Sequence, residues 1–192
     1  MIIVMGLPGS GKSSVLKGLK TDYKILNYGD LMFDIEKEKF GIKDRDEMRT
    51  IPIEKQKEVQ KLVSARLATM EPSAPSSPEA KHPKTEHGKL ILDTHCAVNT
   101  PRGFYPGLPF EFLKHLKVDA LVYITADVAE IVARRANDPT RKRDNDDLAT
   151  HQRMSECYLA AYSAFTGAPA TIIFNRQGKL EEAVAKLQGL LK

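Results

Sequence analysis

Residues 1–14 read Met-Ile-Ile-Val-Met-Gly-Leu-Pro-Gly-Ser-Gly-Lys-Ser-Ser, and the prediction of the fold starts here. Its apolar start predicts a short buried strand, and Gly6 to Ser13 match the G-x-x-x-x-G-K-[ST] pattern of a phosphate-binding loop between a strand and a helix. Glycines let backbone N–H groups approach phosphate oxygens, and the following helix adds partial positive charge at its N-terminus. Lys12 can reach the β- and γ-phosphates, and the Ser13 hydroxyl can ligate Mg²⁺. We therefore expect a nucleoside triphosphate-binding protein rather than a glycine-rich turn that binds nothing.

The composition limits the class of protein further. The chain has 192 residues, which suits one domain with a real core. Its 29 Lys and Arg and 25 Asp and Glu give a formal charge of +4, which a phosphate-rich small substrate explains as well as nucleic acid does. Cys96 and Cys157 have no metal-ligand spacing and favour a reducing, cytoplasmic environment. No apolar run is long enough for a signal peptide or a membrane span, so we expect no membrane partner.

Strand-like runs alternate with helical patterns along the chain. The strand-like runs are 2–5, 24–28, 89–93, 119–125 and 170–174. One helical stripe in 54–70 consists of Val59, Leu62, Val63, Arg66, Leu67 and Met70, and another in 179–191 consists of Leu180, Val184, Leu187 and Leu191. This alternation predicts an α/β domain with a five-stranded parallel sheet, helices on both faces and the ligand outside the carboxyl ends of the strands.

The segment 71–88 departs from this alternation. It is rich in proline and serine, carries charged residues and shows no periodicity. We interpret it as an exposed, flexible loop between a helix and the third strand, not as a domain boundary. His82 and His87 lie in it, and solvated loop histidines explain them better than a metal site.

Asp93 is the first candidate site residue outside the phosphate-binding loop. It ends the apolar run Leu90-Ile91-Leu92, and an acidic residue at the carboxyl end of a strand can hold Mg²⁺ through water in such proteins. The alternative is a polar residue that merely ends the strand. Because Thr94 and His95 follow where a substrate loop belongs, the metal role is favoured.

An arginine cluster follows the fourth strand. Arg134 and Arg135 lie near a predicted helix end, and Arg141, Lys142 and Arg143 lie in a polar loop. The planar, permanently charged guanidinium suits a transferring phosphoryl group. Taken alone, the cluster reads better as a solvated charge run paired with nearby aspartates. After a phosphate-binding loop the catalytic reading is favoured, because phosphoryl transfer needs mobile positive charge that closes over the nucleotides.

A second pair of arginines, Arg45 and Arg49, allows two readings equally. The arginines could hold the phosphate of an acceptor nucleotide. They could also be exposed residues at the start of a helix that Asp44 or Asp46 caps.

Together these residues resemble the archaeal type of adenylate kinase. The matching segments are Gly6-x-Pro8-Gly9-x-Gly11-Lys12, Asn27 to Phe33, Asp44 to Arg49, Asp93-Thr94-His95, Thr100 to Pro109, Arg141-x-Arg143-Asp144 and Ile172 to Asn175. The resemblance extends along nearly the whole chain. It implies Mg²⁺-dependent, reversible phosphoryl transfer from ATP to AMP to give two ADP. It also implies one P-loop NTPase-type domain over 1–192, with an AMP-binding region around 29–70 and a short lid around 138–147.

The resemblance implies a role for each candidate residue. The ATP-binding residues would be Gly6, Leu7, Pro8, Gly9, Ser10, Gly11, Lys12, Ser13, Ser14 and Asn175. The residues acting on the transferring group would be Lys12, Arg135, Arg141 and Arg143, and Mg²⁺ would be held by Ser13 and, through water, by Asp93. The AMP site would use Gly29, Asp30, Arg45, Arg49, His95, Arg102 and Gly107, with residues 105–109 shaping the base pocket. A homotrimer is implied as well.

Two features depart from known patterns. The proline-rich loop 72–87 looks longer than the equivalent connection in the family. Phe33 stands where bacterial-type adenylate kinases place an AMP-phosphate arginine, so Arg45, Arg49 or Arg102 must supply that charge. Other functions stay open, namely a kinase for another monophosphate such as CMP or UMP, or an ATPase or switch module that docks a macromolecule through 72–87. An RNA-binding P-loop protein would rest only on the mild basic charge.

Overall fold

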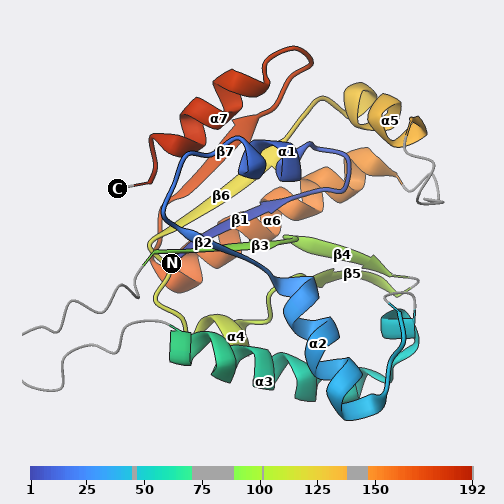
Figure 1. Ribbon diagram of the computed structural model, residues 1–192. Helices are drawn as coiled ribbons and strands as arrows, with labels where there is room; N and C mark the ends of the chain where they lie inside the picture. Colours follow the sequence, from blue (N-terminus) through green and yellow to red (C-terminus); the bar gives the residue numbers. More distant parts are fainter. Residues whose placement is uncertain (45–46, 71–88, 101, 138–146, 192) are drawn as a thin grey trace, which may run out of the picture.

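A parallel sheet of five strands forms the centre of the computed structural model, which describes residues 1–44, 47–70, 89–100, 102–137 and 147–191, without the side chains of 49, 50, 53 and 68–70. The strand order is β2 (Lys24–Asn27), β3 (Leu90–Thr94), β1 (Ile2–Gly6), β6 (Ala120–Thr125) and β7 (Ala170–Phe174) (Figure 1). All five predicted strands are confirmed, with ends that shift by at most one residue. The central strands β1 and β3 are buried along their whole length, as a sheet covered on both faces requires.

Two layers of helices cover the sheet, because alternate side chains of each strand point to opposite faces (Figure 1). Ile2 and Val4 pack with α1 (Lys12–Lys17) and α7 (Leu180–Gln188). Ile3 and Met5 belong to the larger core on the other face. The helices that contribute to that core are α2 (Tyr28–Phe40), α3 (Ile53–Met70), α4 (Phe110–Leu113) and α6 (Leu148–Thr166). The 3₁₀ helix η1 (Glu47–Thr50) and the helix α5 (Val128–Ala136) complete the helices among the described residues.

The predicted helical stripes are confirmed in part. Val59, Val63 and Leu67 of α3 are fully buried in the core. In the predicted stripe of α7, Leu187 is fully buried, whereas Leu180 is 40% exposed. Ala183, which the predicted stripe does not include, is fully buried in the core instead.

A hairpin between β3 and β6 was not predicted. β4 (Ala97–Thr100) and β5 (Gly103–Pro106) pair in antiparallel register, where the sequence indicated only a loop. Both strands are short and partly exposed, so they carry no clear apolar periodicity. The hairpin depends on α6 instead, since the Tyr158 hydroxyl donates to the Phe104 carbonyl oxygen at 3.0 Å.

Candidate active site

The loop after β1 has the backbone that the motif predicts. Gly9 and Gly11 have φ angles of +91° and +82°, in the left-handed region that L side chains rarely adopt. Space forbids a side chain as well, because a Cβ atom on Gly11 would lie 2.1 Å from Nδ2 of Asn175. Gly11 precedes the first residue of α1, Lys12, so the loop delivers the lysine at the start of the helix. The glycines therefore serve both conformation and close packing.

Lys12 and Asp93 form a buried ion pair at the carboxyl edge of the sheet. The Lys12 ammonium contacts Oδ1 of Asp93 and donates to the Thr94 carbonyl oxygen at 2.5 Å. Lys12 and Asp93 are each 8% exposed. Burial lowers the pKa of Lys12, and the neighbouring Asp93 charge opposes that shift. In this conformation Asp93 and Thr94, the last two residues of β3, hold the Lys12 ammonium beside the phosphate-binding loop.

Asn175 and Arg134 hold the loop from the other side. Asn175 follows β7, and its Nδ2 donates to the Ser10 carbonyl oxygen at 3.0 Å. Arg134 donates to the same oxygen at 3.2 Å and to the Asn175 carbonyl oxygen at 2.8 Å, and it pairs with Glu130 one helical turn away at 3.1 Å. Side-chain donors thus satisfy a carbonyl that the tight turn leaves unpaired. Asn175 was expected at this site, whereas a supporting role for Arg134 was not anticipated.

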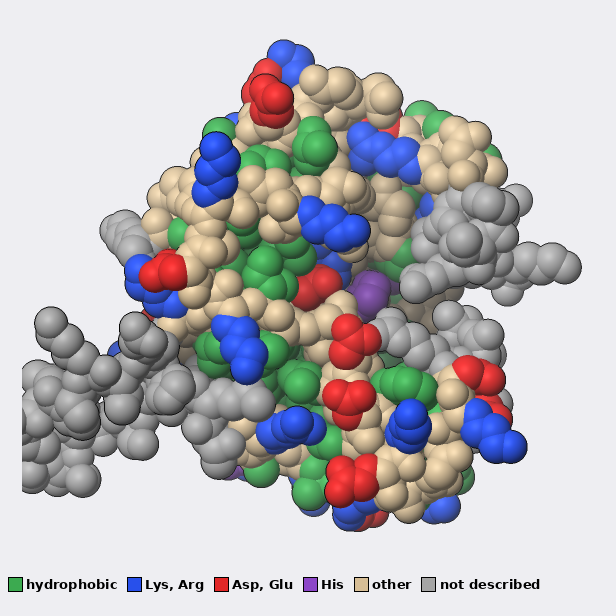
Figure 2. Space-filling model, viewed as in Figure 1, with side chains coloured by type: hydrophobic (Ala, Val, Ile, Leu, Met, Phe, Trp, Pro, Cys, Tyr) green, Lys and Arg blue, Asp and Glu red, His purple; other side chains and the backbone are tan. Residues whose placement is uncertain are grey.

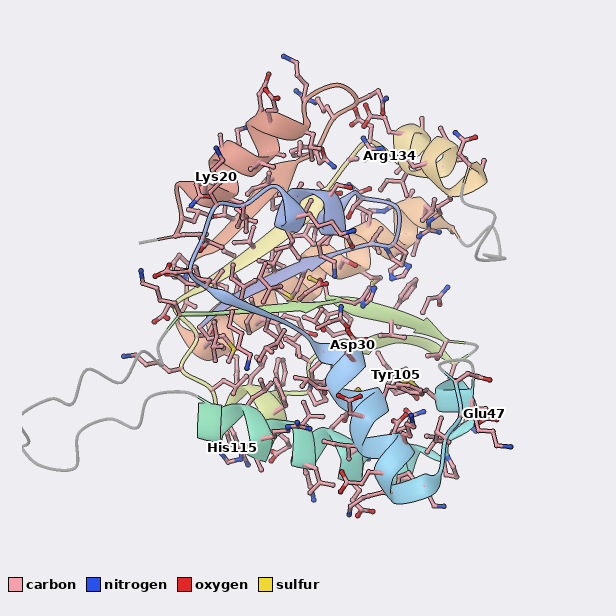
Figure 3. The ribbon with its side chains drawn as sticks, in the orientation of Figure 1. Lys20, Asp30, Glu47, Tyr105, His115 and Arg134 are labelled. Atoms are coloured by element: carbon pink, nitrogen blue, oxygen red, sulfur yellow. The ribbon has the colours of Figure 1, made fainter. Side chains whose placement is uncertain are left out.

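Arg135 also contacts the loop. Its Nε donates to the Pro8 carbonyl oxygen at 2.8 Å, and a Cβ atom on Gly9 would lie 3.0 Å from its Cγ. The predicted helix end is confirmed, since α5 ends at Ala136 directly after the two arginines. Figure 3 shows Arg134 on α5 at one side of the sheet, with Asp30 and Tyr105 on the other side.

The acceptor side is built from the start of α2 and the β4–β5 hairpin. Asp30 is exposed in the first turn of α2, next to Gly29. His95 is exposed directly after β3, and Arg102 is exposed at the hairpin turn, where its N–H donates to the Thr100 hydroxyl at 3.2 Å. Gly107 has a packing role, because a Cβ atom there would lie 1.9 Å from the His95 carbonyl oxygen.

The hairpin is anchored by Tyr162 of α6, a residue that sequence reasoning missed. The Tyr162 hydroxyl donates to the Cys96 carbonyl oxygen at 2.8 Å and accepts from the Leu108 N–H at 3.2 Å. His151, nearer the start of α6, bonds the Ala97 carbonyl oxygen at 3.1 Å. One helix therefore sets the position of the segment that was expected to shape the base pocket. Nothing in the sequence around Tyr162 distinguishes this anchoring role from that of an ordinary buried aromatic residue on a helix.

Several predicted residues lie outside the described part of the chain. They are Arg45, Arg141, Arg143, the lid except Asp147, and the loop 72–87, and the side chain of Arg49 is likewise not described. Asp44 is described, and its carboxylate accepts from the Glu47 N–H at 3.0 Å. The capping alternative is thereby confirmed for Asp44, while the roles of the two arginines there stay predictions.

The residues that would hold Mg²⁺ fit a hard cation. Asp93 offers a carboxylate near the mouth of the phosphate-binding loop, and Ser13 offers an exposed hydroxyl in the first turn of α1. No group of three or more His, Cys, Asp or Glu side chains gathers into a metal cluster within the described residues. A site with one carboxylate and one hydroxyl leaves room for water and nucleotide oxygens, which Mg²⁺ prefers to an all-protein cage.

The described surface around this site carries both signs of charge. On the face in Figure 2, acidic and basic side chains of the described residues are interspersed rather than gathered into one tract. Among the described helices, none has the length and apolar character that crossing a membrane requires.

Comparison with known proteins agrees with this geometry. A family model described as an AAA domain matches residues 5–152. The adenylate kinase of Methanothermobacter thermautotrophicus is 36% identical, over 100% of this chain and 99% of its own length. That of Methanopyrus kandleri is 40% identical over 96% and 93% of the two chains, and that of Thermoplasma acidophilum is 37% identical over 94% and 92%.

Among solved structures, an unliganded sugar kinase from Janibacter sp. HTCC2649 has a similar fold. Its TM-score is 0.52 at 13% identity, with 98% of this chain and 91% of that chain covered, so the likeness concerns the fold alone. The adenylate kinases that match over nearly their full length identify the family of this chain. The ion pair between Lys12 of the phosphate-binding loop and Asp93 at the end of β3 agrees with that assignment. The chain contains an AAA domain and belongs to the adenylate kinase family, in its archaeal type.

Proposed function

We propose that this protein catalyses the reversible, Mg²⁺-dependent transfer of a phosphoryl group from ATP to AMP, forming two ADP. Its membership of the adenylate kinase family supports this proposal. The observation that carries it is the contact of Lys12 with Asp93 at the end of β3, beside the glycine-rich loop. That arrangement sets one positive charge and one carboxylate beside the loop expected to bind the donor phosphates.

The chemistry demands positioning and charge more than covalent steps. The transition state spreads negative charge over three equatorial oxygens, and the acceptor phosphate is already anionic, so no general base is needed. Lys12 and the N–H groups of residues 9–13 would bind the donor phosphates. Ser13 and, through water, Asp93 would hold Mg²⁺, which would neutralise negative charge on the nucleotide phosphates. Binding must draw Lys12 toward the nucleotide, away from its contact with the Thr94 carbonyl oxygen.

Arginines would supply the remaining positive charge. Arg135 is already fixed against the loop through the Pro8 carbonyl oxygen. Arg141 and Arg143 of the lid would close on the transferring group and exclude water, which would otherwise take the phosphoryl group. On the acceptor side, Arg45, Arg49 and Arg102 would orient the AMP phosphate, beside Gly29, Asp30, His95 and Gly107.

A comparison of acceptors tests the proposal. ADP formation from Mg·ATP is measured with AMP, CMP, UMP and GMP offered separately. We expect rapid transfer to AMP alone. A preference for a pyrimidine monophosphate would keep the mechanism but overturn the acceptor, and ATP binding with no transfer to any monophosphate would overturn the kinase reading.

We also propose a cytoplasmic homotrimer. Its support is the family resemblance and the state of the two cysteines, Cys96 and Cys157, which are both free thiols. Light scattering coupled to size-exclusion chromatography tests the assembly, and a mass of one chain would contradict it.

A further inference from the structure

Asn27 stands where the donor and acceptor sides meet. It is the last residue of β2, and the parallel register places it opposite Asp93 of β3. Paired residues of adjacent strands point to the same face of a sheet. The Asn27 Nδ2 donates to Oδ2 of Asp93 at 2.8 Å. The amide therefore contacts the carboxylate that also pairs with Lys12.

The same side chain caps the acceptor helix. Its Oδ1 accepts from the Asp30 N–H at 3.1 Å, and Asn27 has the extended backbone of an N-cap residue, with φ −92° and ψ 121°. The Asn27 side-chain amide thus makes two hydrogen bonds: its Nδ2 donates to Asp93, and its Oδ1 accepts from the backbone of α2. Asparagine meets both needs, whereas aspartate and serine supply the cap but not this donor in the same geometry.

These bonds join into a continuous chain of polar contacts. It begins at the N-terminus of α2, passes through Asn27 to one oxygen of Asp93, and leaves by the other oxygen to Lys12 of α1. The second torsion of an aspartate is broad, so the carboxylate plane is set by what it contacts. Since Lys12 and Asn27 contact different oxygens, removal of Asn27 frees the plane to turn.

We propose that Asn27 is a positioning residue, which orients the Asp93 carboxylate and thereby Lys12, and ties the acceptor helix α2 to the donor site. The inference deepens the proposed function and rests on it for the identity of the two nucleotides. According to this inference, the Asn27 amide helps to align the donor and acceptor nucleotides, which must be positioned precisely for phosphoryl transfer.

Three substitutions separate the two bonds. Asn27→Ser keeps a capping oxygen and loses the donor to Asp93, and Asn27→Ala loses both. Asn27→Asp keeps the cap and sets a carboxylate against Asp93. The control is Ser163→Ala, which removes a bond of 2.6 Å to the Ala168 carbonyl oxygen, between the last turn of α6 and the residues just before β7.

Each variant is measured in three ways: by urea unfolding, by ATP affinity in EDTA without acceptor, and by kcat and KM for ATP and AMP. We expect Asn27→Ser to unfold at a urea midpoint between those of the wild type and Asn27→Ala, because it keeps the cap but loses the bond to Asp93. It should also bind metal-free ATP several-fold more weakly and lose about tenfold in kcat, the scale of one hydrogen bond to a charged group. Asn27→Asp should lose more affinity than Asn27→Ser. Asn27→Ala should match Asn27→Ser in kcat and unfold at lower urea.

Two results would overturn the inference. One is that Asn27→Ser matches the wild type in ATP affinity and kcat while only Asn27→Ala loses stability, since Asn27 would then be a cap and nothing more. The other is that Ser163→Ala reproduces the kinetic losses, which would trace them to general destabilisation.

A double-mutant cycle adds a test of the route. If Asn27 acts through Asp93, then Asn27→Ser should cause little further loss in an Asp93→Asn background, whereas multiplied losses would contradict that route. Failure of the proposed function is separable, because it would appear as wild-type protein that transfers to no monophosphate. The metal-free ATP affinities of the variants would still test the positioning role.

Discussion

Substitution of Glu36 by glutamine should change how stability depends on pH. Glu36 lies on α2 with a fully buried side chain, and neither carboxylate oxygen has a hydrogen-bond partner among the described residues. Burial raises the pKa of Glu36 from its ordinary 4.5 to about 7. Between those values the folded state binds more protons than the unfolded state, so the free energy of unfolding falls as the pH rises.

The pKa shift sets the size of the effect. At 1.36 kcal/mol per pKa unit, the rise from 4.5 to about 7 corresponds to at most about 3 kcal/mol, fully lost above pH 7. Glutamine has nearly the same shape and no charge to lose. The unfolding free energy of Glu36→Gln minus that of the wild type should therefore increase, in favour of the variant, by up to about 3 kcal/mol between pH 4.5 and 8.

Urea unfolding at half-unit pH steps measures this difference. Because both proteins are compared at each pH, the titration of all other groups cancels. Glu38→Gln is the matched control, since it removes the same charge from the exposed side of the same helix. A difference that stays constant across the range, or one that turns against the Glu36 variant as the pH rises, would refute the reasoning.

Three further substitutions test the site and its support. Lys12→Ala should lower kcat/KM by about 10³-fold or more, because its charge acts mainly in the transition state, and near-normal turnover in a coupled assay would contradict this role. Arg143→Ala should lower kcat more than it raises KM for AMP, and the reverse pattern in steady-state kinetics would assign Arg143 to the acceptor site. Tyr162→Phe should lower the free energy of unfolding by about 1–3 kcal/mol, because the buried Leu108 N–H loses its acceptor; an unchanged urea midpoint would count against the anchoring role.

Most of the secondary structure and the sheet could be predicted from local sequence patterns. All five strands were predicted within one residue. The buried strands β1, β3 and β6 contain the apolar runs that a sheet covered on both faces demands, and the edge strands β2 and β7 have fewer buried residues but keep an apolar centre. The β4–β5 hairpin was not predicted, because it is held by Tyr158 and Tyr162 of α6 through bonds to residues 54 and 66 positions earlier in the chain. The stripe in α7 likewise named Leu180, which is exposed, and left out Ala183, which is buried, because a helical period alone does not fix which side of the helix faces the core.

The candidate site likewise contains some residues that the sequence predicted and others that it did not. The phosphate-binding loop, Lys12 and Asp93 were found from a motif and a strand end, both of which are local in sequence. The contact of Arg134 with the Ser10 carbonyl oxygen could not be found so, because the two residues are distant in the chain and a guanidinium near a helix end gives no sign of its target.

The family, the parallel sheet and the place of the phosphate-binding loop could be predicted from the order of the amino acids alone. These follow from short-range patterns of apolar runs, glycines and one lysine, whose backbone demands do not depend on the rest of the chain. The chain of contacts through Asn27, Asp93 and Lys12, and the anchoring of the hairpin by α6, could not be predicted and became apparent only in the folded chain. Those contacts join different strands and helices, and distances between such elements are set when a shared core packs rather than by any local pattern.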